Sequence, residues 1–452
     1  MYHHSDRHFT FYARSLVLLL LVFAVPPRAF EVRAAQQHHF SARDERFLED
    51  LERRSLQYFW EQATPTTGLV LDRTRTDGTP ADEDHRYIAS IAATGFGLTA
   101  ICIASERGWI NRATARDRVR ATLRFFADRA LQEHGWFYHW MDVNTGERRW
   151  RSEVSSIDTA LLVAGALTAR QYFREDSEII KLATRIYERI DFPWMLNGHP
   201  TLLSMGWKPE TGFIKARWDD YSEHLILYLL AIGSPTHPIT PEAWYAWKRN
   251  WNEYAGYRYL GKTPLFTYQY SHAWIDFRGR RETRGEHVDY FENSVKATLA
   301  HRQFCMDLAK EFPGYGPHVW GISASDSPKG YVAWGGPPRD PAIDGTVVPY
   351  AAAGSLMFVP RAALVMLKTI RARYPRIYGN YGFADAFNPN TGWVDRDVIG
   401  IDLGITLLGA ENASTGNVWR WFMRNSEVRR ALDLVGLKKR QQRARTFWRK
   451  AA

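Results

Sequence analysis

Clustered carboxylates beside aromatic residues are the part of this sequence that could carry chemistry. Asp219, Asp220 and Glu223 lie close together, just before the apolar residues 225–230. Like charges at this spacing raise the pKa of one carboxyl, which suits a general acid working near neutral pH. The alternative is an acidic helix N-terminus, which the helix dipole stabilises without any catalytic role.

A second acidic segment precedes another apolar stretch. Ser155 and Ser156 can cap the helix that follows, which puts Glu153 at or just before its start and Asp158 about one turn further in. An acid beside the apolar residues 160–164 is costly to bury without partners. The alternative is that Glu153 serves as a cap and dipole partner while Asp158 faces water.

Three other segments contain candidate residues. Asp402 lies among apolar residues near Gly404, which allows close approach; the alternative is a buried structural aspartate. Asp344 is typical of a turn residue. Residues 268–276 (YQYSHAWID) combine hydrogen-bonding and stacking groups, with an ordinary aromatic packing segment as the alternative.

The chemistry that this combination favours is glycoside cleavage. Two acids flank the bond in that reaction, and the 18 Trp, 22 Tyr and 24 Phe residues can stack on sugars or build a large core. The sequence contains no Gly-Xaa-Ser-Xaa-Gly elbow, Walker loop or dinucleotide fingerprint. The net charge is +10, but no nucleic-acid-binding signature accompanies it, so no nucleic-acid partner is expected.

The elements that must position these residues are helices. Apolar spacing predicts a helix from Ser41 that ends before Pro65, and further helices at about 88–106, 112–132, 154–173, 176–191, 220–232, 241–254, 288–310, 349–372, 402–412 and 415–434. Long connections at 136–151, 193–218, 260–286, 314–349 and 379–398 are typical of functional loops. This alternation predicts one all-α domain, an α/α toroid with the long loops at one end. An irregular helical bundle is the alternative.

The N-terminus has the pattern of an export signal. Arg7 and Arg14 precede the apolar residues 16–25, and Ala34 and Ala35 follow. This predicts a signal peptide over 1–35, a single mature domain over 36–452, and a periplasmic or secreted protein without stable membrane insertion. The alternative is an uncleaved anchor, although a membrane-spanning helix needs about 20 apolar residues. Cys102 and Cys305 are expected as buried free thiols, or as one long-range disulfide after export.

Taken together, several segments resemble the glycoamylase-like family of bacterial proteins, glycoside hydrolase family 144, whose members include β-1,2-glucanases. The matching segments extend over nearly the whole mature chain: 54–60 (RSLQYFW), 152–161 (SEVSSIDTAL), 221–224 (YSEH), 270–278 (YSHAWIDFR), 290–294 (YFENS), 320–326 (WGISASD), 344–347 (DGTV) and 400–404 (GIDLG). One departure is Ile405, which stands where the family pattern leads us to expect Pro.

The resemblance implies an (α/α)6 toroid that hydrolyses β-1,2-glucan to sophoro-oligosaccharides with inversion, without metal or cofactor. We expect Glu223 to be the acid, its pKa raised by Asp219 and Asp220, and Asp402 to be the base. Glu153 and Asp158 are the rivals for either role, or bind the central sugars. The other expected substrate-binding residues are Asp219, Asp344, Gln269, His272 and Arg278 as hydrogen-bonding groups, and Trp136, Trp140, Tyr270, Trp274, Phe277, Trp320 and Trp393 as stacking groups.

Other functions remain open at this stage. A polysaccharide lyase fits the basic charge but not the acidic clusters. A β-1,2-glucan phosphorylase would need phosphate, and a periplasmic glucan-binding protein would not need the four carboxylates Glu153, Asp158, Glu223 and Asp402. A monomer is expected.

Overall fold

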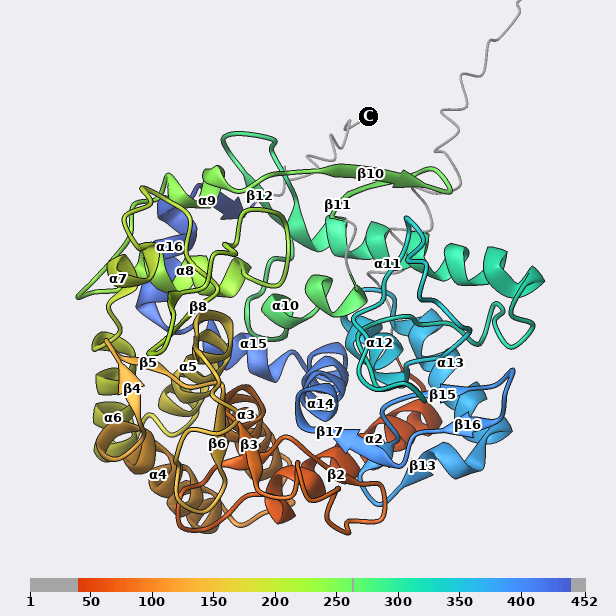
Figure 1. Ribbon diagram of the computed structural model, residues 1–452, viewed down its shortest axis with the longest axis horizontal. Helices are drawn as coiled ribbons and strands as arrows, with labels where there is room; N and C mark the ends of the chain where they lie inside the picture. Colours follow the sequence, from red (N-terminus) through yellow and green to blue (C-terminus); the bar gives the residue numbers. More distant parts are fainter. Residues whose placement is uncertain (1–39, 262–263, 440–452) are drawn as a thin grey trace, which may run out of the picture.

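The computed structural model describes residues 40–261 and 264–439 (Figure 1). The predicted signal peptide, residues 1–35, lies outside them. The helices are α2 (Ala42–Glu61), α3 (Ile91–Glu106), α4 (Arg112–Asp128), α5 (Ser156–Tyr172), α6 (Ser177–Glu188), α7 (Phe192–Leu196), α8 (Leu225–Gly233), α9 (Ala243–Ala246), α10 (Tyr270–Trp274), α11 (Tyr290–Asp307), α12 (Pro349–Ala353), α13 (Pro360–Arg373), α14 (Gly400–Ser414), α15 (Asn417–Phe422) and α16 (Ser426–Leu434).

Short strands pair within the connecting loops, and each is two to four residues long. They are β1 (Val70–Leu71), β2 (Arg73–Arg75), β3 (Ile88–Ser90), β4 (Gln132–Glu133), β5 (Trp136–Phe137), β6 (Trp140–Asp142), β7 (Val154–Ser155), β8 (Gly206–Lys208), β9 (Gly212–Phe213), β10 (Trp251–Tyr254), β11 (Tyr257–Leu260), β12 (Arg280–Glu282), β13 (Tyr378–Gly379), β14 (Gly382–Phe383), β15 (Phe387–Asn388), β16 (Trp393–Val394), β17 (Asp397–Ile399) and β18 (Leu437–Lys439).

The helices form two rings, so the predicted (α/α)6 toroid is confirmed (Figure 1). Helices α3, α5, α8 and α14 are buried on nearly every side, as inner helices must be. By contrast, α2, α4, α6 and α16 are amphipathic and bury one face each. α14 packs against α2, α3, α10 and α12, so the first described helix contacts the last inner helix and closes the ring.

Two glycines let the inner helices α3 and α5 approach closely. A Cβ atom on Gly95 would lie 2.3 Å from the carbonyl oxygen of Leu161, and one on Gly165 would lie 2.1 Å from the carbonyl oxygen of Gly95. These distances leave no room for a side chain, so the backbones themselves are in contact.

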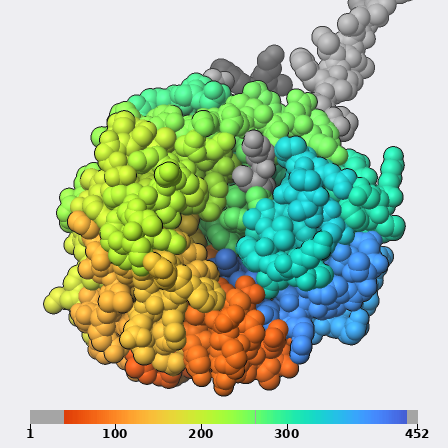
Figure 2. Space-filling view, viewed as in Figure 1, coloured from red at the N-terminus to blue at the C-terminus, as the bar shows by residue number. Residues whose placement is uncertain are grey.

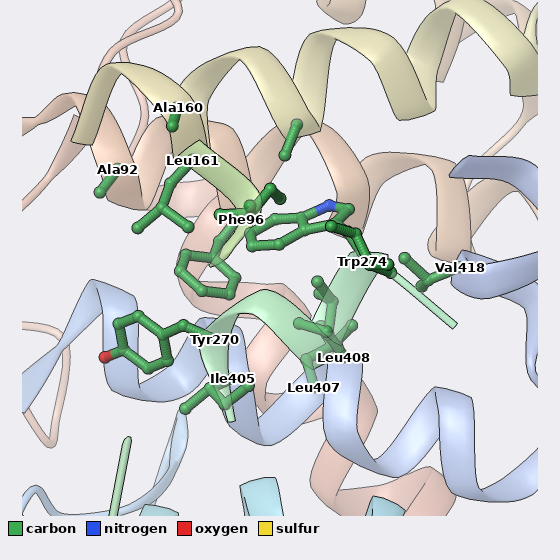
Figure 3. Close-up of a cluster of buried hydrophobic side chains, with 14 of the residues drawn as sticks. Ala92, Phe96, Ala160, Leu161, Tyr270, Trp274, Ile405, Leu407, Leu408 and Val418 are labelled. Atoms are coloured by element: carbon green, nitrogen blue, oxygen red, sulfur yellow. The ribbon is translucent and has the colours of Figure 1, made fainter. Parts of the chain in front are cut away.

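The centre of the toroid is a continuous apolar core. In Figure 3, side chains from α3, α5, α10, α14 and α15 meet around Phe96 and Trp274. The rings of these two residues lie 4.7 Å apart, and the indole N–H of Trp274 donates to the Thr99 hydroxyl at 3.1 Å. The core therefore absorbs a large share of the aromatic residues.

Several element predictions were wrong in their extent. The expected helix over 241–254 is only the short α9, followed by a β10–β11 hairpin. Ala255 and Gly256, both at positive φ, form the two-residue turn of this hairpin, a geometry that favours strand pairing. The expected helix over 349–372 is interrupted before Pro360, which begins α13 at a position where a missing N–H costs nothing.

Two smaller expectations are settled. Cys102 and Cys305 are buried free thiols, which excludes the alternative disulfide. Among the described residues, none of the helices has the length and apolar composition that a membrane span requires.

Candidate active site

The N-terminal ends of several inner helices bring polar side chains to one end of the toroid. Asp158 lies in the first turn of α5, Glu223 lies two residues before α8, Tyr270 begins α10, and Asp402 lies in the first turn of α14. Figure 2 shows a hollow near the middle of this face, bordered by segments coloured yellow to green, cyan and orange. These four side chains interact in sequence: Asp158 with Glu223, Glu223 with Tyr270, and Tyr270 with Asp402.

Glu223 is a half-buried carboxyl whose pKa is raised. Burial is the main reason why its pKa is raised, the charge of Asp158 adds to this, and a hydrogen bond from the Ser222 hydroxyl acts against it. The prediction that Asp219 and Asp220 raise the pKa of Glu223 was therefore wrong. Asp219 instead pairs with Lys248 at 2.9 Å, and Asp220 accepts a hydrogen bond from Asn250 at 2.6 Å.

Glu153 is placed as an ionised carboxylate. His139 Nδ1 lies 3.0 Å from Glu153 Oε1, and its Nε2 lies 3.5 Å from Asp158 Oδ2. The hydrogen bond from His139 lowers the pKa of Glu153 to about 2. Burial alone would lower the pKa of His139, but Asp158 and Glu153 raise it overall. A carboxylate held in this way cannot donate a proton near neutral pH, which leaves Glu153 unsuited to the role of general acid.

Asp158 is oriented by the helix that it begins. Its backbone N–H donates to the Ser155 hydroxyl at 3.3 Å, and that hydroxyl donates to Asp158 Oδ2 at 2.5 Å. Ser155 is the N-cap of α5, as the sequence indicated. Asp158 therefore links three neighbours, Ser155, His139 and Glu223.

Asp402, in the first turn of α14, lies among other acidic residues. The Tyr270 hydroxyl donates to Asp402 Oδ1 at 3.3 Å, and Asp385 lines the same small cavity as Asp402. Burial raises the pKa of Asp402 above its usual range, with Asp72 and Asp326 adding to the effect. A carboxylate with a raised pKa binds a proton more strongly, which suits the catalytic base.

Arginine side chains from β2 neutralise part of this acidic group. Arg73 contacts Asp72 at 3.1 Å and Asp326 at 2.7 Å, and Arg75 contacts Asp397 at 2.6 Å. Oxygens of Asp326, Asp385 and Asp395 lie within 4.8 Å of one another, a spacing that cation ligands can have. The guanidinium of Arg73 already contacts Asp326, however, and Asp385 accepts the backbone N–H of Asp326, so we assign no metal to them.

Most of the expected sugar-binding groups are core residues instead. Trp136, Trp274, Trp320, Phe277, Gln269 and His272 are at most 1% exposed. The side chain of Gln269 donates to Ala351 and Ser355, and His272 lies 3.1 Å from the Ser294 hydroxyl. Burial lowers the pKa of His272 to about 3. Because these side chains are enclosed by protein, the prediction that they contact sugar is wrong, and packing is their role.

The remaining predicted sugar-binding residues lie outside the core. Arg278 follows the C-terminal end of α10, away from Tyr270, where it pairs with Asp276 at 2.7 Å and lies over the Trp419 ring. Asp344 is exposed and accepts the N–H of Thr346 at 2.9 Å, as a turn residue does. Two predicted stacking residues stay partly exposed, Trp140 and Trp393. Trp140 stacks on His139 with the ring centres 3.9 Å apart, so it alone among the predicted tryptophans borders the described carboxylates.

Sequence reasoning missed part of this site. His139, Arg73, Asp385 and Asp395 were not singled out, and Asp326 appeared only within a matching segment. Asp385 had a usable signal, since it is the one charged residue in an otherwise apolar stretch, 382–387 (GFADAF). His139 had none, because its partners lie 14 and 19 positions away.

Comparisons with known proteins agree with this fold. The glycoamylase family model, described as "Putative glucoamylase", matches residues 215–426, which include Glu223 and Asp402. An endo-β-1,2-glucanase from Chitinophaga pinensis is 29% identical, with a TM-score of 0.81 over 88% of this chain and 99% of that one. A β-1,2-glucanase structure from Parabacteroides distasonis is 26% identical, with a TM-score of 0.78 over 88% of this chain and 61% of the other.

A curated relative extends the comparison to a named activity. It is an exo-β-1,2-glucooligosaccharide sophorohydrolase (non-reducing end) from Parabacteroides distasonis, 27% identical over 432 residues. The match covers 87% of this chain but 58% of the relative's length. The family-model match and the shared toroid therefore agree with the resemblance of this chain to the glycoamylase-like family.

Proposed function

We propose that this protein hydrolyses β-1,2-glucan and releases sophoro-oligosaccharides. The observation that carries the proposal is the pair Glu223 and Asp402, two carboxyls with raised pKa values at the N-terminal ends of the inner helices α8 and α14. Relatives with this fold are named as β-1,2-glucan hydrolases, which supports the same substrate class here. Glycosidases need two such carboxyls, one as acid and one as base or nucleophile.

The environments of the two carboxyls support an inverting reaction. Glu223 donates its proton to the glycosidic oxygen as the bond to the anomeric carbon breaks. Asp402 accepts a proton from the attacking water, directly or through a sugar hydroxyl, so that the new bond forms on the opposite face. Glu223 then regains a proton from solvent and Asp402 loses one, which restores both groups.

Neighbouring groups would hold the sugars. The carboxyl oxygens of Glu153 and Asp158 can accept hydrogen bonds from hydroxyls, and Trp140 offers a partly exposed ring beside them. These residues lie on the Glu223 side of the hollow, whereas Arg73 and Asp72 lie on the Asp402 side.

The test is incubation of the purified protein with linear β-1,2-glucan in buffer without phosphate, followed by size separation of the products. A ladder of short oligosaccharides indicates endo action, and release of disaccharide alone indicates exo action. Optical rotation during the reaction reports inversion or retention. Intact glucan, or cleavage only when phosphate is added, would contradict the proposal.

We further infer export to the periplasm or the medium, supported by the order of basic, apolar and small residues in 1–35. The expected result is a mature N-terminus near residue 36 in the exported fraction. Accumulation of the full-length chain in the cytoplasm would contradict this inference.

A further inference from the structure

In Asp385 and in Asp402, only one of the two carboxyl oxygens accepts a hydrogen bond from an N–H or O–H group in the part of the chain that the structure describes. Asp402 Oδ1 accepts from the Tyr270 hydroxyl at 3.3 Å, and Asp385 Oδ2 accepts from the backbone N–H of Asp326 at 2.8 Å. The other two oxygens, Asp402 Oδ2 and Asp385 Oδ1, are buried, and no N–H or O–H donor from the described residues reaches them.

These two carboxyl groups share one small cavity. Tyr350, Phe383 and Thr406 also line it, and each carboxyl is among the causes of the other's shifted pKa. Each residue is 4% exposed, so water does not separate them freely. Two buried, ionised carboxylates here would repel each other, and neither could supply a donor to the other's unpartnered oxygen. One shared proton removes the repulsion and supplies the donor.

We infer that Asp385 and Asp402 share one proton, and that Asp385 is the positioning residue that donates it to the catalytic base. The catalytic part of this inference rests on the proposed function, since it assumes that Asp402 activates water. The shared proton does not depend on that function.

The surroundings favour Asp385 as the proton holder. Burial raises the pKa of Asp385 well above its usual range, and the charges of Asp402 and Asp326 add to this. The hydrogen bond that Asp402 receives acts in the opposite direction on Asp402. The titratable and charged groups that face the pair from neighbouring elements are Asp72 and Arg73 near β2, Tyr270 on α10, Asp326 and Tyr331 in the loop before α12, Tyr350 on α12, and Asp395 and Asp397 at β17.

Proton transfer during hydrolysis follows from this arrangement. The free enzyme holds one proton on the pair, which leaves one negative charge for water activation. When Asp402 accepts the proton of water, the pair holds two protons, and one must leave to solvent before the next turnover. The pair therefore titrates as a unit, and the acidic limb of the pH profile reports the pair and not Asp402 alone.

Two substitutions of Asp385 separate donation from simple packing. In Asp385→Asn, the amide oxygen can accept from Asp326 while the amide N–H₂ donates permanently to Asp402. Because this N–H₂ replaces the donor that the protonated Asp385 carboxyl provides, the acidic limb of kcat against pH is expected to stay within about half a unit of the wild type. In Asp385→Ala the donor is lost, so the limb is expected to move to higher pH, with at least about a tenfold lower kcat.

A second readout does not need activity. The infrared spectrum of the wild type minus that of Asp385→Asn, at neutral pH, should show one C=O stretch of a protonated carboxyl that belongs to the pair, because the other buried carboxyls are common to both proteins and cancel. Asp117→Asn on the outer helix α4, where the side chain is 65% exposed, is the matched control and should keep the band. An unchanged band in Asp385→Asn, or pH profiles that coincide with the wild type in both variants, would overturn the inference. A wild type that leaves glucan intact but shows the band would overturn only the proposed function.

Discussion

At the residue scale, neighbouring groups shift the pKa values of two glutamates in opposite directions. Glu223 is half-buried, and this desolvation raises its pKa, with the charge of Asp158 adding to it, whereas Glu153 pairs with His139, which lowers its pKa to about 2. A general acid must carry its proton at working pH, and of the two glutamates only Glu223 has its pKa shifted in that direction. The assignment therefore comes from the surroundings and not from residue type.

Replacement of Glu223 by Gln is the direct test at this scale. Gln keeps the size and hydrogen bonds of the side chain but cannot donate the catalytic proton. We expect kcat to fall by about 10²–10⁴-fold with little change in KM, measured by product release from β-1,2-glucan. Glu45→Gln, an exposed change on α2, serves as the control with normal kcat. Near-normal turnover of Glu223→Gln would rule out its role as the acid.

At the element scale, the contact between α3 and α5 fixes the start of α5, where Asp158 lies. Gly165→Ala would place a Cβ atom 2.1 Å from the carbonyl oxygen of Gly95, and backbone atoms cannot yield as a flexible side chain can. We expect a loss of about 2 kcal/mol in the free energy of unfolding, measured by urea denaturation. Gly316→Ala, which meets no atom within 4 Å, is the matched control. Equal stability of the two variants would contradict this account of the packing.

The sequence predicts the long helices better than it predicts the short elements and side chains in the connections between them. Apolar spacing located α3, α5 and α14 to within a few residues, because burial on nearly all sides leaves a long apolar run. It missed the five-residue α10, which is too short to show a period, and therefore did not separate Tyr270, at the site, from Trp274, in the core.

The candidate site was predictable only where a residue begins a helix. Glu223, Asp158 and Asp402 precede or begin apolar runs, which made them visible in the sequence. Asp385 and Asp326 come from loops that strand pairing and buried hydrogen bonds bring together, and no local pattern encodes such contacts. For the same reason, the aromatic content of the sequence did not separate sugar-stacking residues from core residues. The structure shows that most of the predicted stacking residues fill the core.

At the scale of the whole molecule, one buried ionic group joins the two ends of the ring. Arg107, just after α3, contacts Glu411 on α14 at 2.7 Å and Glu52 on α2 at 3.5 Å. Burial raises the pKa of Glu52 well above its usual range, and Glu411 adds to this, while Arg107 opposes it. Thr415 and Asn417 also donate to Glu411. Closure of the toroid thus depends on a cation between two buried acids.

Arg107→Met should therefore weaken the whole toroid. It leaves Glu52 and Glu411 facing each other without a cation, and we expect a loss of about 3 kcal/mol at pH 7, at the lower end for buried pairs because Arg107 is 29% exposed. Without Arg107, the folded-state pKa of Glu52 lies further above its unfolded value. The loss is then largest at high pH and shrinks as pH falls toward that unfolded value, where Glu52 is protonated in both states. Urea denaturation between pH 5 and 8 measures this dependence, with the exposed Arg53→Met on α2 as a control that should cost less than about 1 kcal/mol. If Arg107→Met were as stable as Arg53→Met at every pH, the ring would be held closed by apolar packing between α2 and α14 alone.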